Sequence, residues 1–220
     1  FRRVLFRSEM TIKDEGTGTI GLDLNSVSYS EFTSLWIDGF DTAVKMSSPT
    51  NGWSVYNRFT NVTSNLCTTG FWLAPTSTNA HTFYACRYNT DTPNSGGIGW
   101  KIEDSNGNQI IACHGDMVSN TTYFAKLTAT GAGYTDGNVF WGNRIEGDGG
   151  YTTYGIDLGS NVQYSTVGGN YYTAITTARV LNDSGFGNSL YDPVFAQSGI
   201  AATAVWDGVP TGQFVYKRYE

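Results

Sequence analysis

The sequence predicts an all-β protein that forms a parallel β-helix, a solenoid of about six to seven rungs. Short strand-like runs recur about every 28 residues, and a second kind of run returns between them. No segment shows a sustained helical period with helix caps. Because each unit would expose an apolar face that only the next unit can cover, we expect the units to stack.

The first set of runs predicts one face of each rung. The runs are short, rich in β-branched and aromatic residues, and roughly alternating, as expected of strands with one buried side. They start at Val27, Val55, Phe83, Ile111, Val139 and Val162.

The second set of runs predicts another face of each rung. Most of these runs have a leading glycine and then alternate, with apolar residues on both sides of a middle residue. They start at Gly21, Gly39, Gly70, Gly99 and Gly155, and Tyr123 takes the same place without a glycine. The flanking residues should point inward, so the middle residues should point outward: Asp23, Asp41, Trp72, Lys101 and Asp157.

The two ends of the chain differ from this pattern. Residues 1–8 hold three arginines and lack the apolar core of a signal peptide, so they are interpreted as a foreign or truncated leader. The β-helix is expected over residues 9–182. Residues 183–220 lose the repeat and are expected to cap the solenoid or to form oligomer contacts.

The amino-acid composition and charge argue against some classes of function. Charged residues make up only 15% of the chain, which suits stacked rungs because like charges in adjacent strands repel. A net charge of −6 argues against nucleic-acid binding, and no apolar run approaches the ~20 residues of a membrane-spanning helix. A β-sandwich or jelly roll remains the main alternative fold, because its strands also recur between glycine-rich turns.

The cysteines and histidines predict no metal site and no cofactor. Cys67, Cys86 and Cys113 show no CxxC spacing, and their odd number cannot complete a set of disulfides. We expect them to be small buried residues. His81 and His114 are the only histidines, and they lie at no metal-ligand spacing from the cysteines.

One segment carries a resemblance to a known family. Residues 138–147 read Asn-Val-Phe-Trp-Gly-Asn-Arg-Ile-Glu-Gly, and Gly155-Ile-Asp-Leu follows. This pattern resembles the pectate-lyase-like right-handed parallel β-helix proteins, and most of all phage tailspikes and tail fibres. The resemblance spans about residues 20–182 and is clearest over 138–182. It implies a homotrimeric spike, in a virion tail or otherwise extracellular, that binds and often cleaves a bacterial surface polysaccharide.

Two outward columns are candidate sugar-binding sites. In the first, Asp41, Trp72, Lys101 and Asp157 would combine an aromatic ring with polar groups, as suits a sugar. In the second, Arg58, Arg87, His114 and Arg144 would hold an acidic polysaccharide, with Asp116 and Glu146 nearby. The alternatives are ordinary solvated positions in the first column and local pairing of the arginines with acids in the second.

Two chemistries would suit these residues. Hydrolysis needs two carboxyl groups, for which Asp116 with Glu146, or Asp38 with Asp41, are the candidates. Lyase chemistry on a uronate needs a base, His114 or Lys101, and a cation such as Arg87 or Arg144 beside the substrate carboxylate. No G-x-S-x-G, H-E-x-x-H, P-loop or Rossmann motif is present.

The expected function is binding, with or without cleavage, of a bacterial surface polysaccharide by a tailspike-like protein. Two alternatives stay open. One is a secreted bacterial polysaccharide lyase or glycoside hydrolase on the same fold. The other is a structural or adhesive β-helix without catalysis.

Overall fold

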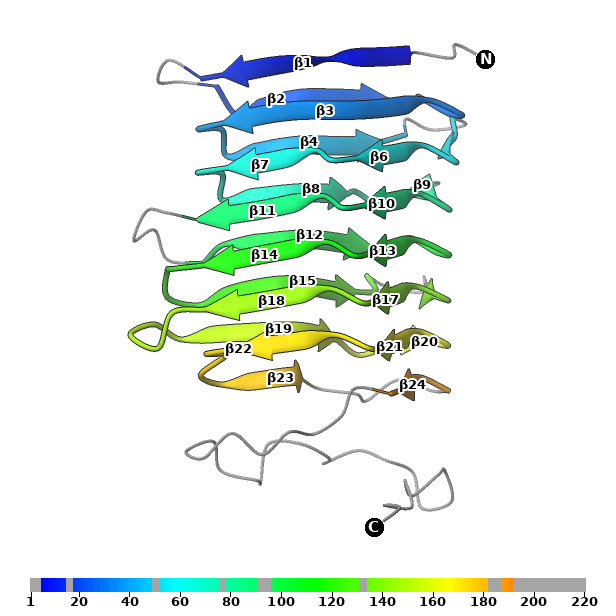
Figure 1. Ribbon diagram of the computed structural model, residues 1–220. Coiled ribbons are helices and arrows are strands. Elements are labelled where there is room, and N and C mark those ends of the chain that lie inside the picture. The colour runs from blue at the N-terminus through cyan, green and yellow to red at the C-terminus, as the bar shows by residue number, and fades with distance from the viewer. Residues whose placement is uncertain are drawn as a thin grey trace.

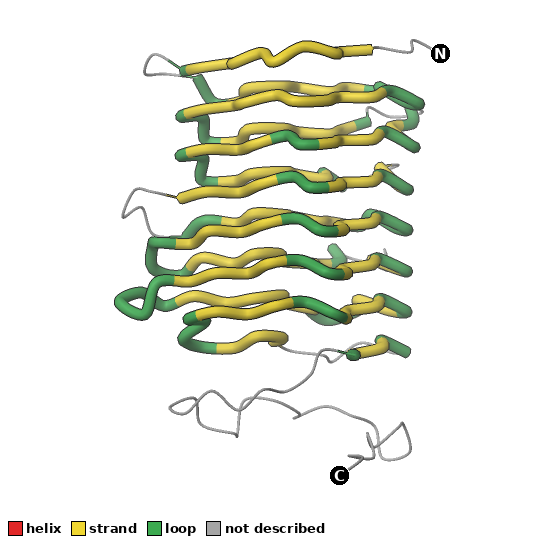
Figure 2. Tube along the Cα trace, in the orientation of Figure 1, coloured by secondary structure: helices red, strands yellow, loops and turns green. Residues whose placement is uncertain are grey.

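The protein is a parallel β-solenoid of about six turns in the computed structural model (Figure 1). The structure describes residues 5–14, 18–48, 52–75, 78–90, 96–130, 134–181 and 187–191. In these ranges every strand pair is parallel and there is no helix (Figure 2), so none that could cross a membrane. The predicted solenoid is therefore confirmed, and a β-sandwich of antiparallel strands is excluded.

Sheet A is the larger sheet and contains 13 strands. Two long strands, β1 and β3, contribute to it early in the chain, and later rungs contribute two short strands separated by a bend. Its strands are β1 (Leu5–Lys13), β3 (Glu31–Asp38), β6 (Arg58–Thr60), β7 (Thr63–Asn65), β10 (Thr82–Tyr84), β11 (Arg87–Thr90), β13 (Gln109–Ile111), β14 (His114–Met117), β17 (Val139–Trp141), β18 (Arg144–Gly147), β21 (Thr166–Gly168), β22 (Tyr171–Thr173) and β24 (Ser189–Leu190).

Sheet B has seven strands and lies behind sheet A (Figure 1). Its strands are β2 (Ile20–Asn25), β4 (Thr42–Ser47), β8 (Thr69–Leu73), β12 (Ile98–Glu103), β15 (Thr122–Thr128), β19 (Thr153–Leu158) and β23 (Ala178–Leu181). Two small sheets complete the rungs: β5 (Ser54–Val55) pairs with β9 (Thr78–Asn79), and β16 (Thr135–Asp136) pairs with β20 (Val162–Gln163).

The core between sheets A and B is built from aromatic stacks that run along the solenoid. On sheet A, the ring centroids of Phe32 and Phe59 lie 4.9 Å apart, and those of Phe59 and Phe83 also lie 4.9 Å apart. On sheet B, Phe71 stacks on Trp100 at 5.1 Å. All five side chains are fully buried. Each ring therefore covers its neighbour in the next rung, which is the stacking that the sequence pattern predicts.

Buried polar side chains form a first ladder where the chain enters sheet A. The backbone N–H groups of Asn57, His81 and Asn108 each donate to the side chain one rung further on, namely His81 Nδ1 (3.2 Å), Asn108 Oδ1 (3.0 Å) and Asn138 Oδ1 (3.0 Å). These steps span 24, 27 and 30 residues. The ladder satisfies backbone groups that the turn leaves without a strand partner.

A second ladder lies at the bend inside sheet A. Asn143 Oδ1 accepts from Cys113 N–H at 2.8 Å, and its amide nitrogen lies 3.0 Å from the Ile110 carbonyl oxygen. Cys113 Sγ lies 3.5 Å from the Phe83 carbonyl, so the thiol takes the place of an amide one rung earlier. All three cysteines are free and buried, as predicted.

The two ladders explain the motif at residues 138–147. Asn138 belongs to the first ladder and Asn143 to the second. Gly142 forms the bend between β17 and β18 with φ +65°, a conformation that glycine adopts without a steric penalty. Ile145 is fully buried. The motif therefore specifies one rung of the solenoid, and its outward residues on β18 are Arg144 and Glu146.

The predicted 28-residue period is only an average. The predicted starts of some runs therefore do not fall at equivalent positions of their rungs. Phe83 is the middle residue of β10, whereas Val55 and Val162 lie in the small sheets, so the predicted run starts do not share one column. On sheet B, β4 begins at Thr42, after Gly39 and Asp41. The rungs differ in length because their turns differ, while the ladders and core stacks keep the register.

The ends of the solenoid extend beyond the predicted boundaries. β1 begins at Leu5, inside the predicted leader, and pairs with β3. β24 adds to sheet A beyond residue 182 by pairing with β21. Most of the predicted capping segment, residues 183–220, lies outside the described residues.

Candidate functional site

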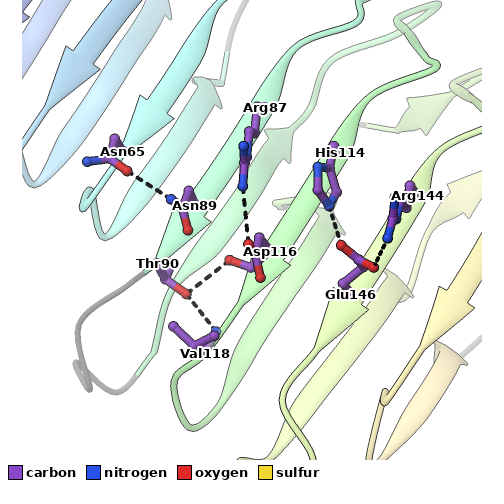
Figure 3. Close-up of polar contacts among 9 residues, drawn as sticks. All are labelled: Asn65, Arg87, Asn89, Thr90, His114, Asp116, Val118, Arg144 and Glu146. Atoms are coloured by element: carbon purple, nitrogen blue, oxygen red, sulfur yellow. Dashed lines mark hydrogen bonds and ion pairs between the residues drawn. The ribbon is translucent and has the colours of Figure 1, made fainter.

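Two columns of outward side chains lie side by side on the second half of sheet A, and together we call them the polar strip (Figure 3). Register defines both columns, because partner residues on adjacent parallel strands point the same way. The first column contains Trp36, Thr63, Arg87, His114, Arg144 and Tyr171. The second column contains Asp38, Asn65, Asn89, Asp116, Glu146 and Thr173.

Ion pairs connect the two columns in the middle of the polar strip. Arg87 Nη2 lies 3.2 Å from Asp116 Oδ2 on the next rung. Glu146 holds two partners at once: its Oε2 lies 2.7 Å from His114 Nε2, and its Oε1 lies 2.6 Å from Arg144 Nη2 (Figure 3). Each acid in this cluster is therefore paired with a cationic or imidazole group.

The environment of Glu146 favours its ionised form. Burial alone would raise the pKa of Glu146, but hydrogen bonds from Arg144 and His114, together with their charges, outweigh it and lower the pKa below its ordinary value. A carboxyl group that acts as a general acid needs the opposite shift. The lowered pKa of Glu146 therefore favours a role as a hydrogen-bond acceptor.

Amide and hydroxyl groups fix the other part of the polar strip. Asn65 Nδ2 donates to Asp38 Oδ1 at 2.8 Å, and Asn89 Nδ2 donates to Asn65 Oδ1 at 2.9 Å. Next to the polar strip, the buried Thr90 hydroxyl accepts from Val118 N–H at 3.1 Å. These bonds hold the side chains in place before any ligand arrives (Figure 3), which reduces the entropic cost of binding.

Exposed aromatic rings border the polar strip. Trp36 and Tyr171 belong to its first column, in which Thr11 of β1 lies beyond Trp36, and Trp141 lies across the bend from it on β17. Trp141 and Tyr171 expose 47% and 62% of their surface. A Cβ at Gly168 would lie 2.4 Å from the Trp141 ring, so the glycine is what allows this ring to lie flat along the sheet.

The structure brings together most residues of the predicted second column. Arg87, His114 and Arg144 share one column, and Asp116 and Glu146 are partners in the neighbouring column. Arg58 is the exception. It lies on β6, on the other side of the bend, where its partners are Glu31 and Thr82. The predicted alignment misplaced Arg58 because the bend was not visible in the strand pattern.

The predicted first column differs from the observed column on sheet B. Asp41 lies before β4 and is not part of it, and Lys45 occupies the expected place. The observed order is Asp23, Lys45, Trp72, Lys101, Lys126 and Asp157. This column lies on sheet B, so it does not join the polar strip of sheet A.

Trp72 is not available as a stacking platform. Lys45 Nζ and Lys101 Nζ, one from each neighbouring strand, lie 4.8 and 4.4 Å from the centre of its ring. Its indole N–H donates to Glu103 Oε2 at 2.6 Å, and Lys101 Nζ lies 3.2 Å from the other oxygen of Glu103. Side chains of the protein thus occupy the positions that a sugar ring would need.

Asp157 also departs from the prediction, because it is only 7% exposed. Burial raises its pKa, and the charge of Lys126 partly opposes this effect. Asp157 is therefore not a solvated outward residue ready to contact a polysaccharide.

Comparison with known proteins does not assign the chain to a family. No family model matches the chain, and no curated protein matches it. Within the described ranges, no group of three or more His, Cys, Asp or Glu side chains has the arrangement of a metal site. The case for function therefore depends on the geometry of the polar strip.

Sequence reasoning missed the aromatic border of this site. Trp141 follows the buried Phe140 and Tyr171 precedes the buried Tyr172, so simple alternation within each run already indicates that both side chains point outward.

Proposed function

We propose that the chain binds a bacterial surface polysaccharide along the outer face of sheet A. The observation that carries this proposal is a preorganised polar strip bordered by half-exposed aromatic rings. Aromatic faces stack on the apolar faces of sugar rings, while planar polar groups such as Arg144 and Glu146 exchange hydrogen bonds with sugar hydroxyls. The resemblance of the rung motifs supports the wider setting that we also propose, a homotrimeric phage tailspike-like protein of the virion tail.

The pairing of charges favours a neutral glycan over an acidic one. Arg87 and Arg144 already face Asp116 and Glu146, and His114 shares Glu146. An acidic polysaccharide would have to displace these carboxylates or lie beside them, at an electrostatic cost. A neutral glycan could use the free edges of the same groups as donors and acceptors.

Hydrolysis is a second candidate because Asp116 and Glu146 are direct partners on adjacent strands. Such strands lie about 4.8 Å apart, close to the ~5–5.5 Å between the carboxyl groups of retaining glycosidases. The lowered pKa of Glu146 fits a nucleophile better than an acid, and Asp116 is held by Arg87. Binding is therefore the primary proposal.

Isothermal titration against delipidated O-antigen and capsular polysaccharides tests this function. At least one neutral polysaccharide is expected to bind, and uronate-rich ones are expected to bind at least tenfold more weakly. Reducing-end and unsaturated products are measured in the same mixtures. Turnover that releases reducing ends without unsaturated products, and that is lost in both Asp116→Asn and Glu146→Gln, would establish hydrolysis. Absence of binding across the panel at the highest attainable protein concentration would exclude the proposal.

A further inference from the structure

Tyr29 and Tyr56 have a strained backbone conformation at a turn where most other rungs have glycine or alanine. Tyr29 and Tyr56 have φ values of +54° and +57°, in the left-handed region that is costly for a bulky residue. They belong to the column of turn residues that precedes the first half of sheet A. The other members of this column also have positive φ, and most of them are small: Ala80, Gly107, Gly137, Tyr164 and Gly187.

Burial of the two tyrosine side chains does not offset the energetic cost of this backbone conformation. The rings of Tyr29 and Tyr56 are 50% and 57% exposed. Glycine or alanine fills the same place in four other rungs. Strained residues of this kind cluster at functional sites, where the side chain is retained for what it contacts.

The two rings form one platform. Their centroids lie 5.2 Å apart with an interplanar angle of 23°, so they stack along the solenoid axis. The backbone fixes them in place: Tyr29 N–H donates to the Val55 carbonyl at 3.0 Å, and Ser28 Oγ donates to the carbonyl of the exposed Trp53 at 3.0 Å. The backbone of Trp53, which directly precedes β5, thereby lies beside Ser28, the residue before Tyr29.

Polar groups flank this platform. Glu31 and Arg58 are partners on β3 and β6, each two residues beyond its tyrosine. Because the stacked rings cover one face of each other, a sugar ring would stack on an outer face of the pair, such as the face of Tyr56 towards the small Ala80 of the next rung. The carboxylate and the guanidinium would then bond the hydroxyls at the rim of the sugar. A protein-binding patch would instead need an apolar core with few charges.

We infer that Tyr29 and Tyr56 form a second sugar-binding site, separate from the polar strip. This inference rests on the proposed function in one respect, because it takes the ligand to be a neutral polysaccharide. It adds a contact point near the N-terminal end of the solenoid, at a turn that the polar strip does not include. A long glycan chain would then be held at two places.

The test uses the whole chain with delipidated neutral O-antigen polysaccharides. Tyr56→Gly introduces the residue found elsewhere in the column, so the melting temperature is expected to stay the same or rise while affinity falls at least tenfold. Tyr56→Phe keeps the ring and is expected to bind within threefold of the wild type. Tyr164→Gly removes a strained, exposed tyrosine from the same column, and its affinity is expected to stay within twofold.

The outcomes separate this site from the polar strip. Loss of affinity in Tyr171→Ala but not in Tyr56→Gly would keep the proposed function and overturn the second site. Self-association that Tyr56→Gly abolishes without changing glycan affinity would also overturn it, by assigning the platform to a second copy of the chain. A wild-type protein that binds no polysaccharide would overturn both proposals.

Discussion

Asn143→Leu is expected to lower the free energy of unfolding by about 2–6 kcal/mol, although the two side chains have similar volumes. The Asn143 side chain serves two buried backbone groups, the Cys113 N–H and the Ile110 carbonyl. Leucine would leave both without a partner, and each such group costs about 1–3 kcal/mol. Urea denaturation of the wild type and the variant measures the difference.

Cys113→Asn is the matched control, because it adds an amide to the same ladder one rung earlier. The new side chain could donate to the Phe83 carbonyl, which now faces the Cys113 thiol. Its stability is expected to stay within about 1 kcal/mol of the wild type. Equal stability of Asn143→Leu and the wild type would contradict the role given to the ladder.

Acid is expected to destabilise the protein through His81. This imidazole is completely buried in the first ladder, its Nδ1 accepts from Asn57 N–H, and its Nε2 has no hydrogen-bond partner among the described residues. Burial lowers the pKa of His81 from 6.5 to about 3. The folded protein therefore keeps His81 neutral over a range in which the unfolded chain binds a proton.

The sign of the effect follows from this difference in proton binding. The contribution of neutral His81 to stability is fully present above pH 6.5 and is lost as the pH falls towards 3. Over this window the free energy of unfolding is expected to fall by about 1.4 kcal/mol per pH unit from this residue alone, or about 3–5 kcal/mol in total.

His81→Asn should remove this slope, because asparagine is the residue that Asn108 and Asn138 place in the same ladder. At pH 7 its stability is expected to lie within about 1 kcal/mol of the wild type. The difference between the two pH profiles isolates His81 from carboxyl groups that also titrate in acid. Parallel profiles, or an imidazole NMR signal of His81 that titrates near pH 6.5, would contradict this account.

The fold could be predicted because the residues that shape each rung lie close together in the sequence. The motif at residues 138–147 supplies two ladder asparagines, a bend glycine and a core isoleucine, and each acts within one rung or on the next. Such local rules are visible in the order of residues. The mean period was visible for the same reason.

The phase of individual rungs could not be predicted, because it depends on turn lengths that vary from rung to rung. Asp41 was misplaced when Gly39 was aligned with the glycines of sheet B, although β4 begins only at Thr42. Arg58 was misplaced because a bend divides sheet A between β6 and β7. An error of a few residues moves a side chain to another column, or to the other side of a strand.

The sequence also could not predict which aromatic rings are accessible to a ligand. Trp72 and Trp141 both alternate with buried residues and both point outward. Only packing between rungs distinguishes them: lysines lie over the ring of Trp72, while Trp141 lies over a glycine and remains half exposed. Contacts between residues about 30 positions apart decide which ring a ligand can reach.

The affinity of a neutral polysaccharide for Trp141→Ala and for Trp72→Ala tests the central claim most directly. The two variants remove the same side chain from opposite sheets of the solenoid. If the aromatic border of sheet A binds the glycan, Trp141→Ala should weaken binding about tenfold or more, equivalent to about 1.4 kcal/mol, and Trp72→Ala should stay within twofold. Loss of binding in Trp72→Ala with normal binding in Trp141→Ala would place the ligand on sheet B and contradict this account.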